Sequence, residues 1–187
     1  MTGRLIYVIG PSGAGKDSVL QGLRSQWPGY IPVHWACRTI TRAATPHGEC
    51  HEAVDKAGFE QLSLSNAFAL QWRANGLAYG VRHEEVRRVM HGHWVFVNGS
   101  RAYLPELLQF APQATVVHIS ASPEVLKSRL LARGRESEAA ISARMQRAVE
   151  LELPPASIQI MNDGVLEDAV INLRKHLMAE QSKGVTD

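Results

Sequence analysis

The sequence has few cysteines, few aromatic residues and little net charge. Cys37 and Cys50 do not stand in a CxxC or in a long-range paired spacing, which argues against a disulfide framework and favours a reducing cytoplasmic location. The formal charge of +2 over 187 residues is too small to indicate a nucleic-acid partner. Function therefore has to be sought in local motifs.

Long hydrophobic runs are also missing. The run before Gly10 covers only residues 5–9, and no later segment approaches the roughly 20 apolar residues of a membrane span. We expect neither a signal peptide nor a membrane partner. The composition, 45% hydrophobic and 20% charged, is typical of a globular protein and predicts a single domain over residues 1–187.

Short apolar runs alternate with helical patterns along most of the chain. This alternation predicts an α/β fold with a parallel sheet covered on both faces. The stretch over residues 37–81 breaks the rhythm and shows no clear buried strand, so we expect a mobile substrate-binding insertion there. Strands are predicted at residues 5–9, 31–36, 94–98, 115–120 and 158–161, and helices at residues 16–26, 84–91, 104–110, 123–132, 139–151 and 166–179.

The stretch GPSGAGKDS is the strongest motif. Its spacing of Gly10, four residues, Gly15 and Lys16 follows a predicted strand and opens a predicted helix, where backbone N–H groups and the helix dipole hold phosphate oxygens. Lys16 can reach the β and γ phosphates of ATP. The predicted ATP ligands in this loop are Gly10, Pro11, Ser12, Gly13, Ala14, Gly15, Lys16, Asp17 and Ser18.

Asp17 stands where this motif usually has a serine or threonine. An acidic residue is favourable in a first helical turn, but beside a triphosphate it is repulsive unless a cation lies between. Asp17 and Ser18 are therefore the candidate ligands of Mg²⁺.

From this loop onward the sequence resembles the guanylate kinase-like group of P-loop phosphotransferases. The resemblance is carried by TITR at residues 39–42 with Gly48-Glu49, QWRANGLAYG at residues 71–80, SRLLARGRESEAAISAR at residues 128–144 and Asn162-Asp163. It implies a three-layer P-loop kinase fold with a parallel central sheet, a small acceptor-binding insertion at residues 37–82 and an arginine-bearing lid at residues 133–147. It also implies catalytic roles for Lys16, Arg133 and Arg144, weaker lid roles for Arg129 and Arg135, and an adenine site at Asn162.

Departures from guanylate kinases point to a different acceptor. Gln71 replaces their guanine-binding glutamate, Arg38 replaces a small hydroxyl residue, and Thr45 replaces a second arginine. An amide cannot accept two N–H groups as a carboxylate does, whereas an added arginine favours phosphate. The candidate acceptor ligands are Arg38, Arg42, Gln71, Tyr79, Asn98 and Arg101, with Arg73 as a weaker candidate.

The phrases GPSGAGKDS, ITR, ANGLAYGV and VNGSRAYLP resemble the ribose 1,5-bisphosphate kinases of bacterial phosphonate catabolism. This resemblance implies transfer of the ATP γ-phosphoryl group to a small phosphosugar, giving 5-phospho-α-D-ribosyl 1-diphosphate and ADP. A nucleoside monophosphate or sugar-acid kinase and a non-catalytic phosphopeptide-binding module remain the alternatives. Oligomeric state is left open, with a homodimer as one candidate.

Two further hypotheses concern metals. Asp17 is a candidate replacement for a carboxylate that guanylate kinases carry near Asn98. The cluster HGECH at residues 47–51 has three ligand types within five residues but no distant fourth, which does not favour a structural zinc site.

Overall fold

A computed structural model describes residues 2–43, 51–132, 134, 141 and 153–183. The chain forms two compact units, which we describe separately. Unit 1 contains Met1–Tyr7 and Gly29–Thr115, and unit 2 contains Val8–Pro28 and Val116–Asp187. The expected single domain over residues 1–187 stays a prediction.

The parallel sheet expected from the apolar runs is present. Its five strands are β1 (Arg4–Ile9), β2 (Val33–Trp35), β7 (Trp94–Asn98), β8 (Thr115–Ser120) and β9 (Ile158–Met161), in the order β2-β7-β1-β8-β9. Within unit 1, β2 pairs parallel with β7, and within unit 2, β8 pairs parallel with β9. All five residues of β7 are buried, as expected for a strand covered on both faces. The predicted α/β class is confirmed.

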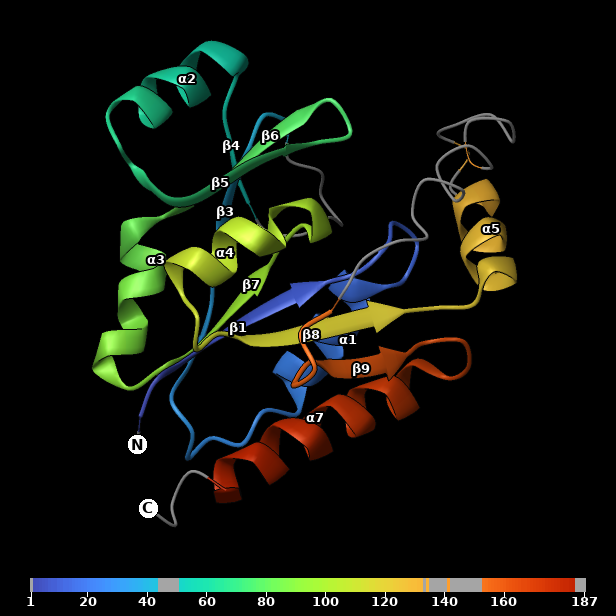
Figure 1. Ribbon diagram of the computed structural model, residues 1–187. Coiled ribbons are helices and arrows are strands. Elements are labelled where there is room, and N and C mark those ends of the chain that lie inside the picture. Colours follow the sequence, from blue (N-terminus) through green and yellow to red (C-terminus); the bar gives the residue numbers. More distant parts are fainter. Residues whose placement is uncertain (1, 44–50, 133, 135–140, 142–152, 184–187) are drawn as a thin grey trace. The chain divides into compact units, whose positions relative to one another are not determined.

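Unit 2 joins β8 and β9 to three helices (Figure 1). These are α1 (Lys16–Ser25), α5 (Pro123–Ala132) and α7 (Leu166–Lys183). Helices α1 and α7 pack closely, because a Cβ atom on Gly22 would lie 2.7 Å from Cγ2 of Val170. Of the helix predicted at residues 139–151, only residue 141 is among the described residues.

Unit 1 corrects the prediction that residues 37–81 lack a buried strand. They contain β3 (Arg38–Ile40), β4 (His51–Ala53), α2 (Lys56–Leu64) and β5 (Phe68–Ala74), and β6 (Leu77–Arg82) begins within them. The four strands form a second sheet in the order β4-β3-β6-β5, and all three residues of β3 are buried.

A turn signal for this second sheet was present in the sequence. Asn75 and Gly76 adopt positive φ angles of 52° and 75° and join β5 to β6. An Asn-Gly pair in this conformation makes the two-residue turn that suits the twist of a hairpin. Strands β3 and β4 were missed because they have only three residues each, and β5 and β6 because buried and more exposed residues alternate along them.

The second sheet has two chemically different faces. Phe59 of α2 packs against Phe68 and Ala78, so we call this side the α2 face. Directly paired residues share a face, and Tyr79 pairs with Trp72 on β5 and with Ile40 on β3. Because faces alternate along a strand, Leu70 and Arg38 belong to the same side, which we call the Tyr79 face.

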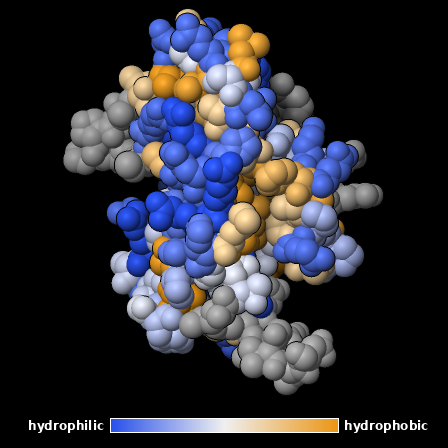
Figure 2. All heavy atoms as spheres, turned by 90° about the vertical axis from the view of Figure 1, so that its left-hand side faces the viewer, coloured by the Kyte–Doolittle hydropathy of each residue, from blue (hydrophilic) through white to orange (hydrophobic). Residues whose placement is uncertain are grey.

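The remaining described elements of unit 1 are short helices. They are α3 (His83–Arg87), η1 (Arg88–His91), η2 (Arg101–Tyr103) and α4 (Leu104–Phe110). Figure 2 shows a face on which hydrophilic residues predominate and apolar residues gather in smaller groups. Within the described chain, no helix is both long and apolar enough to span a bilayer.

Candidate functional site

The phosphate loop of unit 2 has a strained backbone that requires glycine. A Cβ atom on Gly10, at φ +155°, would lie 1.9 Å from the backbone oxygen of Ile119. Gly15 is the N-cap of α1, adopts φ +82° and leaves space for the amide nitrogen of Asn162, which a Cβ atom would meet at 2.5 Å. Only glycine therefore allows the loop to approach β8 and β9 this closely.

Side-chain hydrogen bonds hold this loop in place. The Lys16 ammonium donates to the carbonyl oxygens of Gly10 at 2.9 Å and Pro11 at 3.2 Å. The Asn162 amide donates to the Ala14 carbonyl at 2.8 Å. The loop is thus tied to its own lysine and to the residue that follows β9.

A pocket of about 280 Å³ opens beside the loop. Its lining brings together Gly13, Gly15, Ser18, Arg129, Asn162, Gly164 and Leu166. Asn162 is 3% exposed, and its Oδ1 atom makes no hydrogen bond within the described chain. A buried acceptor without a partner is costly unless a ligand supplies a donor. The glycine cradle and this acceptor therefore fit a bound nucleotide.

The predicted Mg²⁺ ligands lie in the first turn of α1. Ser18 lines the pocket, and Asp17 is its exposed neighbour. No cluster of three or more His, Cys, Asp or Glu side chains suited to a metal occurs among the described residues. Protein-bound Mg²⁺ commonly uses one or two carboxylates together with substrate phosphates and water, so Asp17 and Ser18 fit a nucleotide-bound ion.

In unit 1, the structure brings Arg38 and Tyr79 together on the Tyr79 face. The Arg38 guanidinium carbon lies 5.3 Å from the centre of the Tyr79 ring, and its Nη1 donates to the Asn98 carbonyl at 2.9 Å. Arg38 is 8% exposed and Asn98 is buried. Three predicted acceptor ligands are therefore connected, Asn98 through its backbone oxygen.

Two more predicted ligands, Arg42 and Arg101, are partly buried arginines. The Nε atom of Arg42 is buried and makes no hydrogen bond within the described part of the chain. Burial lowers the pKa of the Arg101 guanidinium, because its charged form loses hydration. Both groups would be stabilised by an anionic ligand.

Gln71 and Arg73 point elsewhere. The Gln71 side-chain oxygen accepts a hydrogen bond from the Ser63 hydroxyl at 2.8 Å, and Arg73 forms an ion pair with Glu60. Ser63 and Glu60 both belong to α2, so these two side chains lie on the α2 face. The structure does not bring them together with Arg38 and Tyr79. On β5, the two neighbours of Gln71, Leu70 and Trp72, lie on the Tyr79 face, and Leu70 is fully buried.

Two aromatic residues of this face were missed as site candidates. Trp72 stacks on Tyr79 with ring centres 5.5 Å apart and an interplanar angle of 4°, and Tyr103 lies 5.8 Å from Trp72. The Asn-Gly turn would have paired Trp72 with Tyr79. No sequence signal indicated Tyr103, because it reaches Trp72 only through the fold.

Tyr7 supports the turn that carries Asn98 and Arg101. Its buried hydroxyl accepts from the Ser100 N–H at 2.9 Å and lies 3.3 Å from the Ser100 carbonyl, to which it donates. Burial raises the pKa of Tyr7 above its usual value of 10, against a smaller opposing effect of the Ser100 hydrogen bond. The hydroxyl is therefore kept neutral by the fold.

A Tyr7→Phe variant is expected to lose about 1–3 kcal/mol of unfolding free energy at neutral pH, because it leaves the Ser100 N–H without an acceptor. The wild type should also lose stability above pH 10, since the unfolded chain ionises Tyr7 there while the folded chain does not. In the variant this loss should be smaller by up to about 1.4 kcal/mol per pH unit. Urea unfolding at several pH values measures both effects, and equal alkaline slopes would contradict the assignment.

Part of the predicted site lies outside the described residues. Arg133, Arg144 and Arg135, together with most of the lid at residues 133–147, lie outside the described residues, as do Thr45 and Gly48-Glu49. Asp17 belongs to unit 2 and Asn98 to unit 1, so their proposed compensation stays a prediction. His51 is described, and its ring bonds to the Arg42 carbonyl at 3.1 Å.

Comparison with known proteins adds the family. The guanylate kinase family model matches residues 2–180. The chain belongs to the guanylate kinase family. The guanylate kinase of Anaplasma phagocytophilum, a solved structure, shares the fold with a TM-score of 0.65 at 16% identity, covering 96% of this chain and 87% of that one.

The chain is more similar in sequence to proteins named ribose 1,5-bisphosphate phosphokinase PhnN than to this guanylate kinase. It is 45% identical to the one from Pseudomonas paraeruginosa over 91% of this chain and 92% of that protein. It is 48% identical to the one from Laribacter hongkongensis over 88% of this chain, but spans only 40% of that longer protein. The expected P-loop kinase is confirmed.

Proposed function

We propose that this protein is an ATP-dependent kinase that phosphorylates ribose 1,5-bisphosphate, forming 5-phospho-α-D-ribosyl 1-diphosphate and ADP. The observation that carries the proposal is the 45% identity to a ribose 1,5-bisphosphate phosphokinase over nine-tenths of both chains. We place the reaction in the cytoplasm, as a step of phosphonate degradation, with a small-molecule phosphosugar as the acceptor.

In unit 2, the loop and its pocket would hold ATP. Gly13, Gly15 and Ser18 line the phosphate end, and Arg129 adds a cation. The Lys16 ammonium, which donates to the Gly10 and Pro11 carbonyls, would turn to the β and γ phosphates. Asp17 and Ser18 would hold Mg²⁺, which neutralises phosphate charge and helps align the transferred group.

In unit 1, Arg38, Arg42, Arg101 and the Tyr79 hydroxyl would hold the acceptor phosphates. An oxygen of the 1-phosphate attacks the γ-phosphorus as the bond from that phosphorus to the ADP oxygen breaks. A phosphate is already largely deprotonated near neutral pH, since its second pKa is about 6, so no general base is assigned. The protein's contribution is alignment and cationic stabilisation, to which we expect Arg133 and Arg144 to add.

An ADP-release assay with ribose 1,5-bisphosphate, GMP, AMP and gluconate as separate acceptors tests the proposal. We expect the highest kcat/KM with ribose 1,5-bisphosphate and a product carrying a diphosphate, which ³¹P NMR identifies directly. A preference for GMP would overturn the proposal in favour of a nucleotide kinase. No turnover together with no binding of Mg-ATP would instead favour a non-catalytic binding module.

A further inference from the structure

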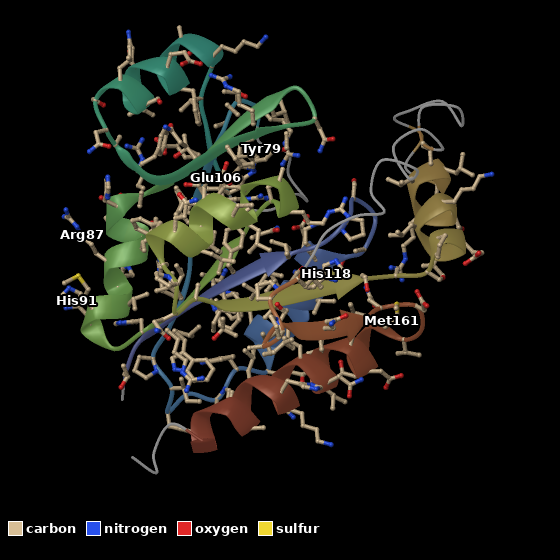
Figure 3. The ribbon with its side chains drawn as sticks, in the orientation of Figure 1. Tyr79, Arg87, His91, Glu106, His118 and Met161 are labelled. Carbon is tan, nitrogen blue, oxygen red and sulfur yellow. The ribbon has the colours of Figure 1, made fainter. Side chains whose placement is uncertain are left out.

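The Tyr79 ring lies between two side chains from its neighbouring strands, Trp72 of β5 and Arg38 of β3. Strand β6 lies between β5 and β3, so Trp72 and Arg38 approach Tyr79 from opposite sides of the same sheet face. The Trp72 ring is parallel to it at 5.5 Å, and the Arg38 guanidinium carbon lies 5.3 Å from its centre. Figure 3 shows where Tyr79 lies on β6.

We propose that the stack of Trp72, Tyr79 and Arg38 determines which acceptors the site binds. Arg38 excludes acceptors that carry a nucleobase, because it covers the face of the Tyr79 ring on which a base would stack. The inference rests on the proposed function, because it concerns the same acceptor site. Tyr79 then meets the substrate with its hydroxyl and ring edge, while a ribose phosphate without a base needs no ring face.

Arg38 is held firmly enough for this role. Its Nη1 donates to the Asn98 carbonyl at 2.9 Å, and only 8% of the residue is exposed. A cation over an aromatic ring is attracted by the ring quadrupole, and burial of the cation strengthens this attraction. A base would have to displace the guanidinium from both Tyr79 and Asn98 to gain one stacking contact.

Three further residues of the Tyr79 face, Leu70, Ile40 and Val81, offer no group that could read a base. Leu70 and Ile40 are fully buried and Val81 is aliphatic. Recognition of a purine edge needs paired hydrogen-bonding groups, which these side chains lack. Arginine and tyrosine, by contrast, supply N–H and O–H donors that suit phosphate.

The test compares Arg38→Ala, which uncovers the ring, with Arg38→Met, which removes the charge but keeps a side chain over the ring. Equilibrium binding of GMP and of ribose 5-phosphate is measured by calorimetry for both variants and the wild type. GMP is ribose 5-phosphate with a base added, so the ratio of the two affinities isolates the contribution of the base. Both variants should bind ribose 1,5-bisphosphate at least about tenfold more weakly than the wild type, since each loses the guanidinium.

We expect Arg38→Ala to raise the ratio of GMP to ribose 5-phosphate affinity by about tenfold, in line with the stacking of one base on an aromatic ring. Arg38→Met should leave this ratio at the wild-type value. Equal ratios in the two variants would overturn the proposal. Circular dichroism checks that each variant folds. If Arg38→Ala does not fold, Trp72→Ala is used to uncover the other side of the Tyr79 ring, with Trp72→Phe as its control. The same ratio of GMP to ribose 5-phosphate affinity is then compared between these two variants.

The two proposals fail separately. The proposed function fails if the wild type does not phosphorylate ribose 1,5-bisphosphate, a result obtained without any variant. The stacking inference fails on the affinity ratios alone, which require no turnover.

Discussion

A Lys16→Met variant is expected to lose about 10³-fold in kcat, because it removes a cation aimed at the charge that develops on the transferred phosphoryl group. Methionine retains an unbranched apolar side chain but cannot donate to the Gly10 and Pro11 carbonyls or to phosphate. The loss should fall mainly on kcat, since Gly13, Gly15 and Asn162 still line the nucleotide pocket.

Steady-state kinetics and the Kd for ATP measure this effect. Lys175→Met, an exposed change on α7 in the same unit, is the matched control and should keep wild-type rates. Circular dichroism separates a catalytic loss from unfolding. A folded Lys16→Met enzyme with kcat within tenfold of wild type would contradict the assignment.

An Arg42→Met variant should lower kcat/KM for the phosphosugar by about 100-fold, because two charge-assisted hydrogen bonds to phosphate are lost. The Kd for ATP should stay unchanged. Stability should not fall, because the buried Arg42 Nε makes no hydrogen bond within the described chain, and methionine keeps much of the apolar stem. If Arg42 had only a structural role, its replacement would lower stability and leave kcat/KM for the phosphosugar unchanged.

The control for Arg42 is Arg87→Met, which removes another arginine of unit 1. Arg87 is exposed on α3, and Figure 3 shows where it lies. We expect less than a twofold change in kcat/KM for this variant. If Arg42→Met lowers the melting temperature but leaves the KM for the phosphosugar unaltered, Arg42 packs the fold and does not bind substrate.

Strands β1 and β7 of the parallel sheet were predictable because each contains a continuous apolar run, over residues 5–9 and 94–97. Strands β7 and β8 lie at the predicted residues 94–98 and 115–120. The search for apolar runs failed in the second sheet, where buried and exposed residues alternate along β5 and β3 has only three residues. There the Asn75-Gly76 turn was the better guide, because its backbone conformation sets the hairpin register.

The candidate ATP site was more predictable than the acceptor site. A phosphate loop is a local motif, so its glycines and Lys16 could be identified from spacing. Arg129 and Asn162, which the family resemblance had indicated, line the pocket beside the loop. Acceptor ligands come from separate strands, and spacing does not give the face on which each side chain lies. Gln71 was expected at the acceptor site but lies on the α2 face, because neighbouring residues of β5 point to opposite faces of the sheet.

The sequence by itself determined the α/β class, the phosphate loop and the unusual arginine at position 38. Each depends on local composition or on residues close together in the chain. Only the tertiary structure decided that Trp72, Tyr79 and Arg38 stack across three strands and that Gln71 faces away from them. The reason is physical, because strand order and register bring distant residues into contact, and neither is encoded in the spacing of any one segment.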